Sequence, residues 1–163
     1  MAFLLLLTGL VTSCSSEEPL PGKAVRIIDG DTAVIVAAGR QITCRLYGID
    51  APEKGGWGRK GQPNAREAEQ ALKSLIDEQS VELVLTGEKT YNRPVCLIRK
   101  DGQDINLEMV RRGFAWAYRK HLTSPYASAY LDAEKDARAR RSGIWQDANP
   151  LPPWEFKRRF WKE

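Results

Sequence analysis

The sequence predicts an α+β fold, a five-stranded OB-fold β-barrel with three helices. Its 163 residues suit one compact domain with short extensions. Short segments rich in β-branched residues and segments with helical periodicity predict three strands, a helix, two strands and then two helices. A five-stranded meander with a helix between its third and fourth strands is how an OB barrel is built. We therefore expect one barrel domain.

The first three strands are expected at residues 23–28, 32–37 and 41–47. The turn Asp29-Gly30-Asp31 separates the first two, and Gly39-Arg40 makes a hairpin into the third. The Gly-rich, basic residues 54–63 then predict an exposed mobile loop.

Asn64 and Glu67 predict a capping box at the start of the first helix, whose apolar stripe is Ala68, Leu72, Leu75 and Ile76. Two further strands follow at residues 81–86 and 93–100. Asp104 opens a second helix that Gly113 closes, and Ser124-Pro125 opens a third that ends at Gly143.

The N-terminus predicts export. Residues 3–11 form an apolar run too short to span a bilayer comfortably, as the core of a signal peptide is. It leads into Val11-Thr12-Ser13-Cys14, which resembles the lipobox of bacterial lipoproteins, where the cysteine is lipidated. Ser15 after Cys14 favours the outer membrane. The alternative is a cleaved secretory signal with an incidental cysteine.

These features divide the chain into four parts. We expect a signal peptide at 1–13, a lipidated N-terminus and tether at 14–22, the barrel domain at 23–146 and a basic-aromatic tail at 147–163. The protein would then be lipid-anchored in the cell envelope through Cys14, or secreted. Nothing in the sequence suggests an obligate oligomer, so we expect a monomer.

The charge balance favours an anionic partner such as nucleic acid or a membrane surface, because 25 Lys and Arg face 21 Asp and Glu. This excess is small and indicates no particular function by itself. The number of histidines excludes more mechanisms. The single histidine, His121, excludes mechanisms that need two catalytic histidines, and we expect it to be an ordinary surface residue.

Three motifs carry candidate chemistry: Asp29-Gly30-Asp31-Thr32, the segment from Arg45 to Glu53, and Tyr91-Asn92-Arg93-Pro94. Each has an ordinary structural explanation alone, as a hairpin turn, a helix cap or a solvated side chain. Together, in this order around this strand pattern, they resemble the D-G-D-T, R-L-x-x-x-D-x-P-E and Y-G-R motifs of the staphylococcal nuclease family. The resemblance covers about residues 23–145.

The resemblance implies a nuclease that hydrolyses DNA or RNA and leaves 3′-phosphates. Arg45 and Arg93 match the family's catalytic arginines, and Glu53 matches its proposed general base. These residue types suit the reaction, since planar bidentate cations stabilise the negative charge of a phosphoryl transition state and a carboxylate can deprotonate the attacking water.

The resemblance also implies Ca²⁺, a cation that prefers oxygen ligands. Asp31 and Asp50 match the family's metal carboxylates, and Ala51 falls where the family supplies a backbone carbonyl. Asp29 and Thr32 are expected to support this site by shaping the turn and its charge.

Two tyrosines are candidates for substrate binding. Tyr91 lies beside the Arg93 turn, and Tyr118 falls near the family's base-stacking tyrosines. For Tyr118, packing under the last helix is an equal alternative. Lys54, Arg59 and Lys60 in the mobile loop could steer a polyanion to the cleft or simply be solvated.

The chain departs from the family pattern around the third motif. Lys89 stands where many members carry an acid, Asn92 replaces the turn glycine, and Pro94 removes a strand hydrogen-bond donor. We expect these changes to affect turnover rather than the type of reaction.

Cys44 and Cys96 lie on two strands expected to be neighbours, each close to one of the two arginines. In an oxidising compartment they could form a disulfide that ties these strands together. The alternative is two free, buried cysteines that act as small apolar residues.

Two rival functions are a noncatalytic OB module that binds nucleic acid or protein, and an envelope lipoprotein with a structural or adhesive role. A pure binder has no need of Asp31, Arg45, Asp50, Glu53 and Arg93 together, so we favour the enzyme.

Overall fold

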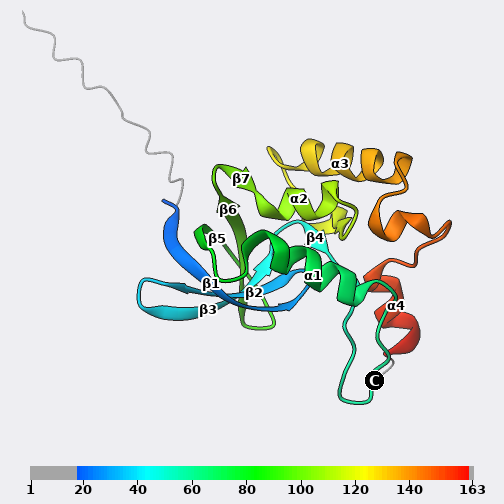
Figure 1. Cartoon of the computed structure of the whole chain (residues 1–163), viewed down its shortest axis with the longest axis horizontal. Coiled ribbons are helices and arrows are strands. Elements are labelled where there is room, and N and C mark those ends of the chain that lie inside the picture. Colours follow the sequence, from blue (N-terminus) through cyan, green and yellow to red (C-terminus); the bar gives the residue numbers. More distant parts are fainter. Residues whose placement is uncertain (1–17, 162–163) are drawn as a thin grey trace, which may run out of the picture.

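The structure is a computed structural model that describes residues 18–161, and the predicted signal peptide and Cys14 lie outside this part. Five long strands form the sheet in the order β3-β2-β1-β5-β6, and a parallel pairing of β3 with β6 closes it into a barrel (Figure 1). The predicted five-stranded OB-type barrel is therefore confirmed. The strands are β1 (Leu20–Asp29), β2 (Thr32–Ala37), β3 (Arg40–Leu46), β5 (Ser80–Thr90) and β6 (Arg93–Lys100).

Short strands extend this framework at one end. β4 (Ile49–Asp50) pairs with β8 (Trp116–Ala117), and β7 (Gln103–Asp104) pairs with the end of β6. The β4–β8 pairing sets Asp50 opposite Trp116, which connects the predicted metal-binding segment to the chain that follows α2.

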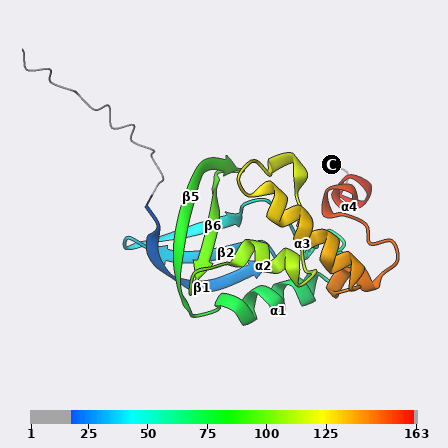
Figure 2. The same cartoon turned by 90° about the horizontal axis from the view of Figure 1, so that it is seen from above.

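Helices cover one side of the barrel (Figure 2). The three predicted helices are present, and a fourth, α4, lies in the basic-aromatic tail, where the sequence had indicated no helix. The helices are α1 (Ala65–Ile76), α2 (Ile105–Arg111), α3 (Ala127–Ala139) and α4 (Pro153–Phe160), with short 3₁₀ turns η1 (Arg119–His121) and η2 (Gly143–Gln146). No helix within residues 18–161 is long and apolar enough to cross a membrane.

Several element ends differ from the predictions. β1 begins at Leu20, inside the predicted tether, because residues 20–23 pair with the start of β5. The predicted capping box is wrong, since Asn64 takes a left-handed conformation (φ 65°) and its side chain makes no capping hydrogen bond. Asp104 does cap α2, because its carboxylate accepts a hydrogen bond from the Leu107 amide at 3.0 Å. The third helix begins at Ala127, later than the sequence indicated.

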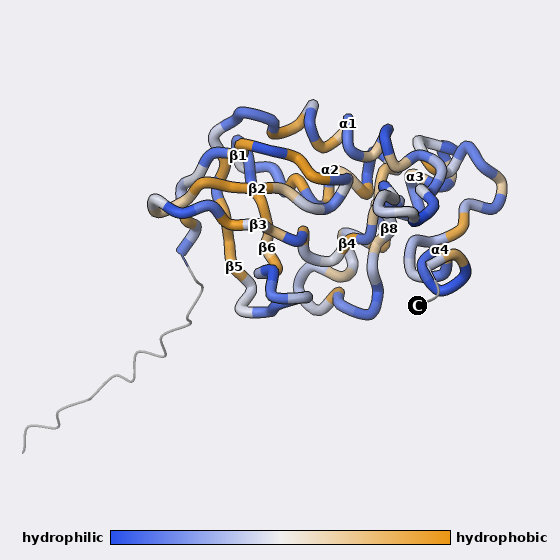
Figure 3. Tube along the Cα trace, turned by 90° about the horizontal axis from the view of Figure 1, so that it is seen from below, coloured by the Kyte–Doolittle hydropathy of each residue, from blue (hydrophilic) through white to orange (hydrophobic). Residues whose placement is uncertain are grey.

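The core fills the barrel and the space under α1, α2 and α3, and Figure 3 shows the hydrophobic residues concentrated along the barrel strands. One polar residue, Asn106, is completely buried there. Its amide nitrogen donates to the carbonyls of Tyr47 (3.1 Å) and Cys96 (3.0 Å), and its oxygen accepts from the Ile98 amide (3.2 Å). Asn106 thereby joins the end of β3 to β6, the two strands that carry the predicted catalytic arginines.

Candidate active site

Two arginines lie at the same end of the barrel. Arg45 pairs with Val95 in the parallel β3–β6 ladder, and Val95 is two residues from Arg93. Because side chains alternate along a strand, Arg93, Val95 and Arg45 lie on one face of the sheet. Nη1 of Arg93 also lies 3.4 Å from Oγ1 of Thr32, the β2 residue paired with Arg45. The fold thus brings both arginines to the D-G-D-T turn.

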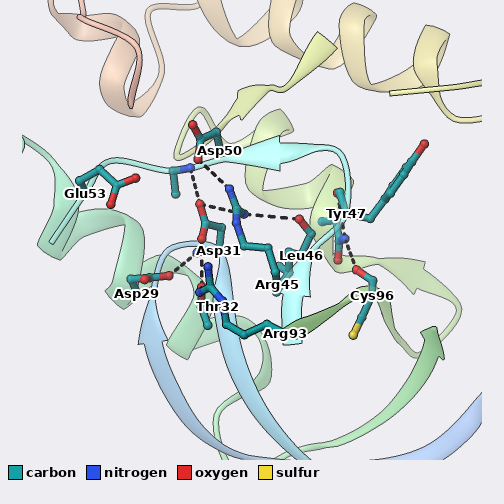
Figure 4. Close-up of polar contacts among 12 residues, drawn as sticks. Asp29, Asp31, Thr32, Arg45, Leu46, Tyr47, Asp50, Glu53, Arg93 and Cys96 are labelled. Carbon is teal, nitrogen blue, oxygen red and sulfur yellow. Dashed lines mark hydrogen bonds and ion pairs between the residues drawn. The ribbon is translucent and has the colours of Figure 1, made fainter. Parts of the chain in front are cut away.

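Arg45 lies between two buried carboxylates (Figure 4). Its Nη1 is 3.0 Å from Oδ2 of Asp31, and its Nη2 is 2.6 Å from Oδ1 of Asp50. Burial lowers the pKa of the Arg45 guanidinium, but the attraction of Asp31 and Asp50 outweighs burial and raises it above its usual value. Arg45 is therefore permanently charged and fixed by two partners.

Three aspartates, Asp29, Asp31 and Asp50, gather around Arg45. Burial, followed by repulsion from Asp31, raises the pKa of Asp29 to about 7. Burial, followed by the same repulsion, also raises the pKa of Asp50 to about 7, against the opposing effect of Arg45. A cation bound between carboxylates that repel one another would stabilise their charged forms.

The turn that carries Asp31 approaches the β4 segment closely. A Cβ atom on Gly30 would lie 2.7 Å from the Cβ atoms of both Ala51 and Ala68, so glycine is needed there. The approach lets Oδ2 of Asp31 accept a hydrogen bond from the Ala51 amide at 2.7 Å. The predicted metal ligands Asp31, Asp50 and Ala51 therefore belong to one cluster.

The donor set of this cluster suits Ca²⁺. The predicted ligands are two carboxylates and one carbonyl, all oxygen donors of the kind that Ca²⁺ prefers. Within residues 18–161, no group of three or more His, Cys, Asp or Glu side chains is arranged to hold a metal ion. The mutual repulsion of the carboxylates around Asp31 is what favours a cation there.

Glu53, the predicted general base, lies beside this cluster with its side chain 20% exposed (Figure 4). Its backbone amide donates to Oε1 of the buried Gln62 at 3.1 Å, and Nε2 of Gln62 donates to the carbonyl of Leu151 at 2.6 Å. Gln62 therefore fixes the loop that follows Glu53 against the tail. Sequence reasoning missed Gln62, because nothing marks it within a polar loop.

Lys157 of α4 is the second residue that the sequence did not reveal. Its Nζ lies 2.5 Å from Oε1 of Glu53 and 3.6 Å from Oδ2 of Asp50. Burial lowers the pKa of Lys157, but the attraction of Asp50 and Glu53 raises it overall. A basic tail is the only sequence feature that could have pointed to it.

Two cavities meet at the arginines, with volumes of about 470 and 620 Å³. The smaller one contains Asp50, Tyr118 and His121, and the larger one contains Asp31, Glu53 and Arg59. These volumes lie within the range of ligand-binding clefts. The residues that line both cavities are Arg45, Tyr91, Arg93 and Lys157.

The two candidate substrate tyrosines differ. Tyr91 is 91% exposed at the rim of both cavities, where a base could stack on it. Tyr118 lines the smaller cavity, but its ring also stacks on that of Trp154, with 5.4 Å between the ring centroids. The centroid of the His121 ring is 4.9 Å away. Tyr118 is therefore packed against the tail at the edge of the cavity, and its role in substrate binding stays a prediction. His121 is exposed, as expected, although it also lies at the cavity edge.

Each of the three cationic side chains predicted to lie in the loop at residues 54–63 contacts another side chain. Lys54 forms an ion pair with Glu69 at 2.7 Å, Arg59 lies over the ring of Trp161, and Lys60 lies over Phe160. Of these, only Arg59 lines one of the two cavities at the arginines. The loop is therefore packed against the tail.

Cys44 and Cys96 are buried in the core and joined by a disulfide, with 5.8 Å between their Cα atoms. Cys96 pairs with Leu46 in the β3–β6 ladder. The bond thus links the two arginine-bearing strands one residue from Arg45.

Comparison with known proteins identifies related sequences. A family model described as "Staphylococcal nuclease homologue" matches residues 43–147, which include Arg45, Asp50, Glu53 and Arg93. An uncharacterized endonuclease of Haemophilus influenzae is 36% identical over 155 residues, 94% of this chain and 82% of the relative. An uncharacterized endonuclease of Escherichia coli O157:H7 is 33% identical over 139 residues, 85% of each chain. A micrococcal nuclease of Shigella flexneri is 34% identical over 158 residues, 91% of this chain and 87% of the relative.

Proposed function

The chain belongs to the staphylococcal nuclease family and is a nuclease, and we propose that it cuts DNA or RNA with Ca²⁺ through Arg45, Glu53 and Arg93. The observation that carries this proposal is the position of Arg45 between Asp31 and Asp50, with Arg93 at the same end of the barrel. Relatives named endonucleases favour cutting within a strand.

The two arginines act on the phosphate. Both face the cavities beside Asp31, so their guanidinium groups can contact one phosphodiester from two strands. Negative charge on the phosphoryl oxygens grows in the transition state, and fixed cations stabilise that state more than the ground state. The ion pairs to Asp31 and Asp50 hold Arg45 in position before the substrate arrives.

Asp31, Asp50 and the carbonyl of Ala51 would hold Ca²⁺. When bound, the cation would neutralise charge on the phosphate oxygens and help to orient the substrate. The chain contributes the carboxylates, and Thr32 supports them because its hydroxyl donates to Oδ1 of Asp31 at 3.1 Å. Asp29 steadies the turn by accepting a hydrogen bond from the Asp31 amide at 3.1 Å.

Glu53 would take the proton of the attacking water. Its carboxylate lies beside Asp50 and lines the larger cavity, where a water could reach the phosphate. The Gln62 hydrogen bond fixes its backbone. Attack that expels the 5′ oxygen would leave a 3′-phosphate, as the family resemblance implies.

Export and lipidation of Cys14 remain part of the proposal, supported by the apolar run and the lipobox-like residues 11–14. In that setting the enzyme would act as a monomer in the cell envelope, most readily at the outer membrane. Mass spectrometry of the protein from a membrane fraction tests this point, because lipidation adds a diacylglyceryl mass at Cys14.

Hydrolysis assays test the enzymatic proposal. The domain from Glu18 onward, which keeps all of β1, would be incubated with single-stranded DNA and with RNA, in Ca²⁺ and in chelator. We expect cutting that requires Ca²⁺ and falls about 10²–10⁴-fold in a Glu53→Gln variant. Glu67→Gln, an exposed position on α1, is the matched control. A folded protein that cuts neither substrate in Ca²⁺ would instead support the noncatalytic binding module.

A further inference from the structure

Helix α4 reaches the catalytic centre from outside the region that the family model matches. The matched residues end at 147, and α4 begins at Pro153. Nevertheless its Lys157 contacts Glu53 and Asp50, as described above. The helix therefore adds side chains to a site whose other groups come from the barrel.

The tail is held in this place by specific contacts. Phe156 is 3% exposed, and Nε1 of Trp161 donates to the carbonyl of Lys60 at 2.9 Å. Arg59 also lies over the Trp161 ring, 5.2 Å from its centroid. With the Gln62–Leu151 hydrogen bond, these contacts connect both ends of the tail helix to the loop after Glu53. α4 thus lies beside this loop (Figure 1) and forms one wall of the two cavities at the arginines.

The side chains of this wall are basic where they face the cavities. Lys157 lines both cavities, and Arg158 and Trp161 line the larger one. The next residue, Arg159, lines neither cavity and lies over the ring of Phe160 instead. One turn of the helix thus contains two cations directed to the cleft and one directed elsewhere.

Lys157 has hydrogen-bonding capacity left for a ligand. An ammonium group has three donors, and among residues 18–161 only Oε1 of Glu53 lies within hydrogen-bonding distance, since the Asp50 contact is 3.6 Å. Arg158 is exposed, so its guanidinium can reach a ligand in the cavity without losing a buried partner. Both groups share the cleft with Arg45 and Arg93.

We propose that α4 forms a phosphate-binding subsite for the polynucleotide, in which Lys157 and Arg158 contact phosphodiester groups at and next to the one that is cut. The strand would pass between α4 and the turn carrying Tyr91, since both line the two cavities. The subsite rests on the proposed function only for the class of ligand, a nucleic acid. It would raise affinity for any sequence, because phosphate contacts carry no base information.

Binding measured without catalysis tests the subsite. A fluorescent single-stranded DNA of mixed sequence would be titrated in chelator with the domain from Glu18 onward, over a series of salt concentrations. The proteins compared are the wild type and the variants Lys157→Gln, Arg158→Gln and Arg159→Gln. We expect the first two variants to bind about tenfold more weakly than wild type. Each should also reduce the slope of log affinity against log salt by about 0.7, the value for one phosphate contact to a single strand.

Arg159→Gln is the matched control, because it removes the same charge from the same turn without facing the cleft. We expect it to change affinity by about twofold or less, since salt screens a cation that makes no direct contact. Thermal unfolding monitors folding of each variant. If Lys157→Gln does not fold, the exposed Arg158 still decides the question.

The outcomes separate the subsite from the nuclease mechanism. The subsite would be overturned if Lys157→Gln and Arg158→Gln bound the DNA with the same affinity as Arg159→Gln. It would also be overturned if the wild-type protein did not bind the DNA at low salt. Ca²⁺-dependent cutting by the wild type is measured in parallel. If the wild type cuts DNA but the variants bind it as tightly as the wild type does, only the subsite is contradicted. If the wild type does not cut but the variants bind DNA more weakly, only the catalytic mechanism is contradicted.

Discussion

Nη2 of Arg45 lies 2.6 Å from Oδ1 of Asp50, so the proposed phosphate clamp and the proposed metal carboxylate are direct partners. Their side chains are 14% and 3% exposed, and Asp31 completes the group with its own contact to Arg45. Catalytic and structural roles therefore coincide at Arg45. Arg93 has no comparable ion pair within residues 18–161. Its guanidinium makes a long contact, 3.4 Å, to the neutral hydroxyl of Thr32.

This difference predicts unequal effects on stability. Arg45→Met leaves two buried carboxylates without their cation, and we expect it to lower the free energy of unfolding by about 3 kcal/mol. Arg93→Met should cost about 1 kcal/mol or less, although both variants should lose activity by about 10²–10³-fold. Urea denaturation at neutral pH measures the first effect. A loss of only about 1 kcal/mol or less in Arg45→Met would show that the Arg45 ion pairs contribute little to stability.

The carboxylate cluster predicts where Ca²⁺ binds. Asp31→Asn and Asp50→Asn each remove a negative oxygen ligand, so we expect each to weaken Ca²⁺ binding by about tenfold or more. Isothermal titration calorimetry with CaCl₂ measures this effect without substrate. Asp132→Asn, at an exposed position of α3, should bind Ca²⁺ like wild type. Unchanged affinity in both site variants would place the cation elsewhere.

The barrel and the centre of the site could be predicted because their signals are local. Strand periodicity and turn residues set the barrel, and the motifs fix the spacing of Asp31, Arg45 and Asp50. The sequence does not show that Arg45 bridges the two aspartates, since this geometry depends on how closely the turn at Gly30 packs on Ala51.

The contribution of the tail could not be predicted, because its contacts are long-range. Lys157 is 104 residues from Glu53, and Gln62 is 89 residues from Leu151. No periodic pattern records such contacts. The capping box at Asn64 fails for a local reason instead. Asn64 takes a left-handed conformation (φ 65°), and its side chain makes no capping hydrogen bond there.

Gln62 is expected to affect turnover through Glu53. Gln62→Ala removes both the acceptor of the Glu53 amide and the donor to Leu151, which releases the loop from the tail. We expect kcat to fall about tenfold, because small displacements of a catalytic group are costly. Steady-state kinetics on single-stranded DNA measures this, with the exposed Gln70→Ala as control. A change confined to KM would contradict a role in positioning Glu53.

The disulfide predicts a stability that depends on redox state. Cys44 and Cys96 are separated by 52 residues, and closing a loop of that size in the unfolded chain stabilises the fold by roughly 2–4 kcal/mol. We expect the Cys44→Ala/Cys96→Ala double variant to lose about that much in urea denaturation, and reductant to lower the stability of the wild type but not of the variant. Small cavities left by the two sulfurs would lower stability regardless of redox conditions. Insensitivity of the wild type to reductant, with two free thiols in the non-reduced protein, would contradict a role for the bond in joining β3 to β6.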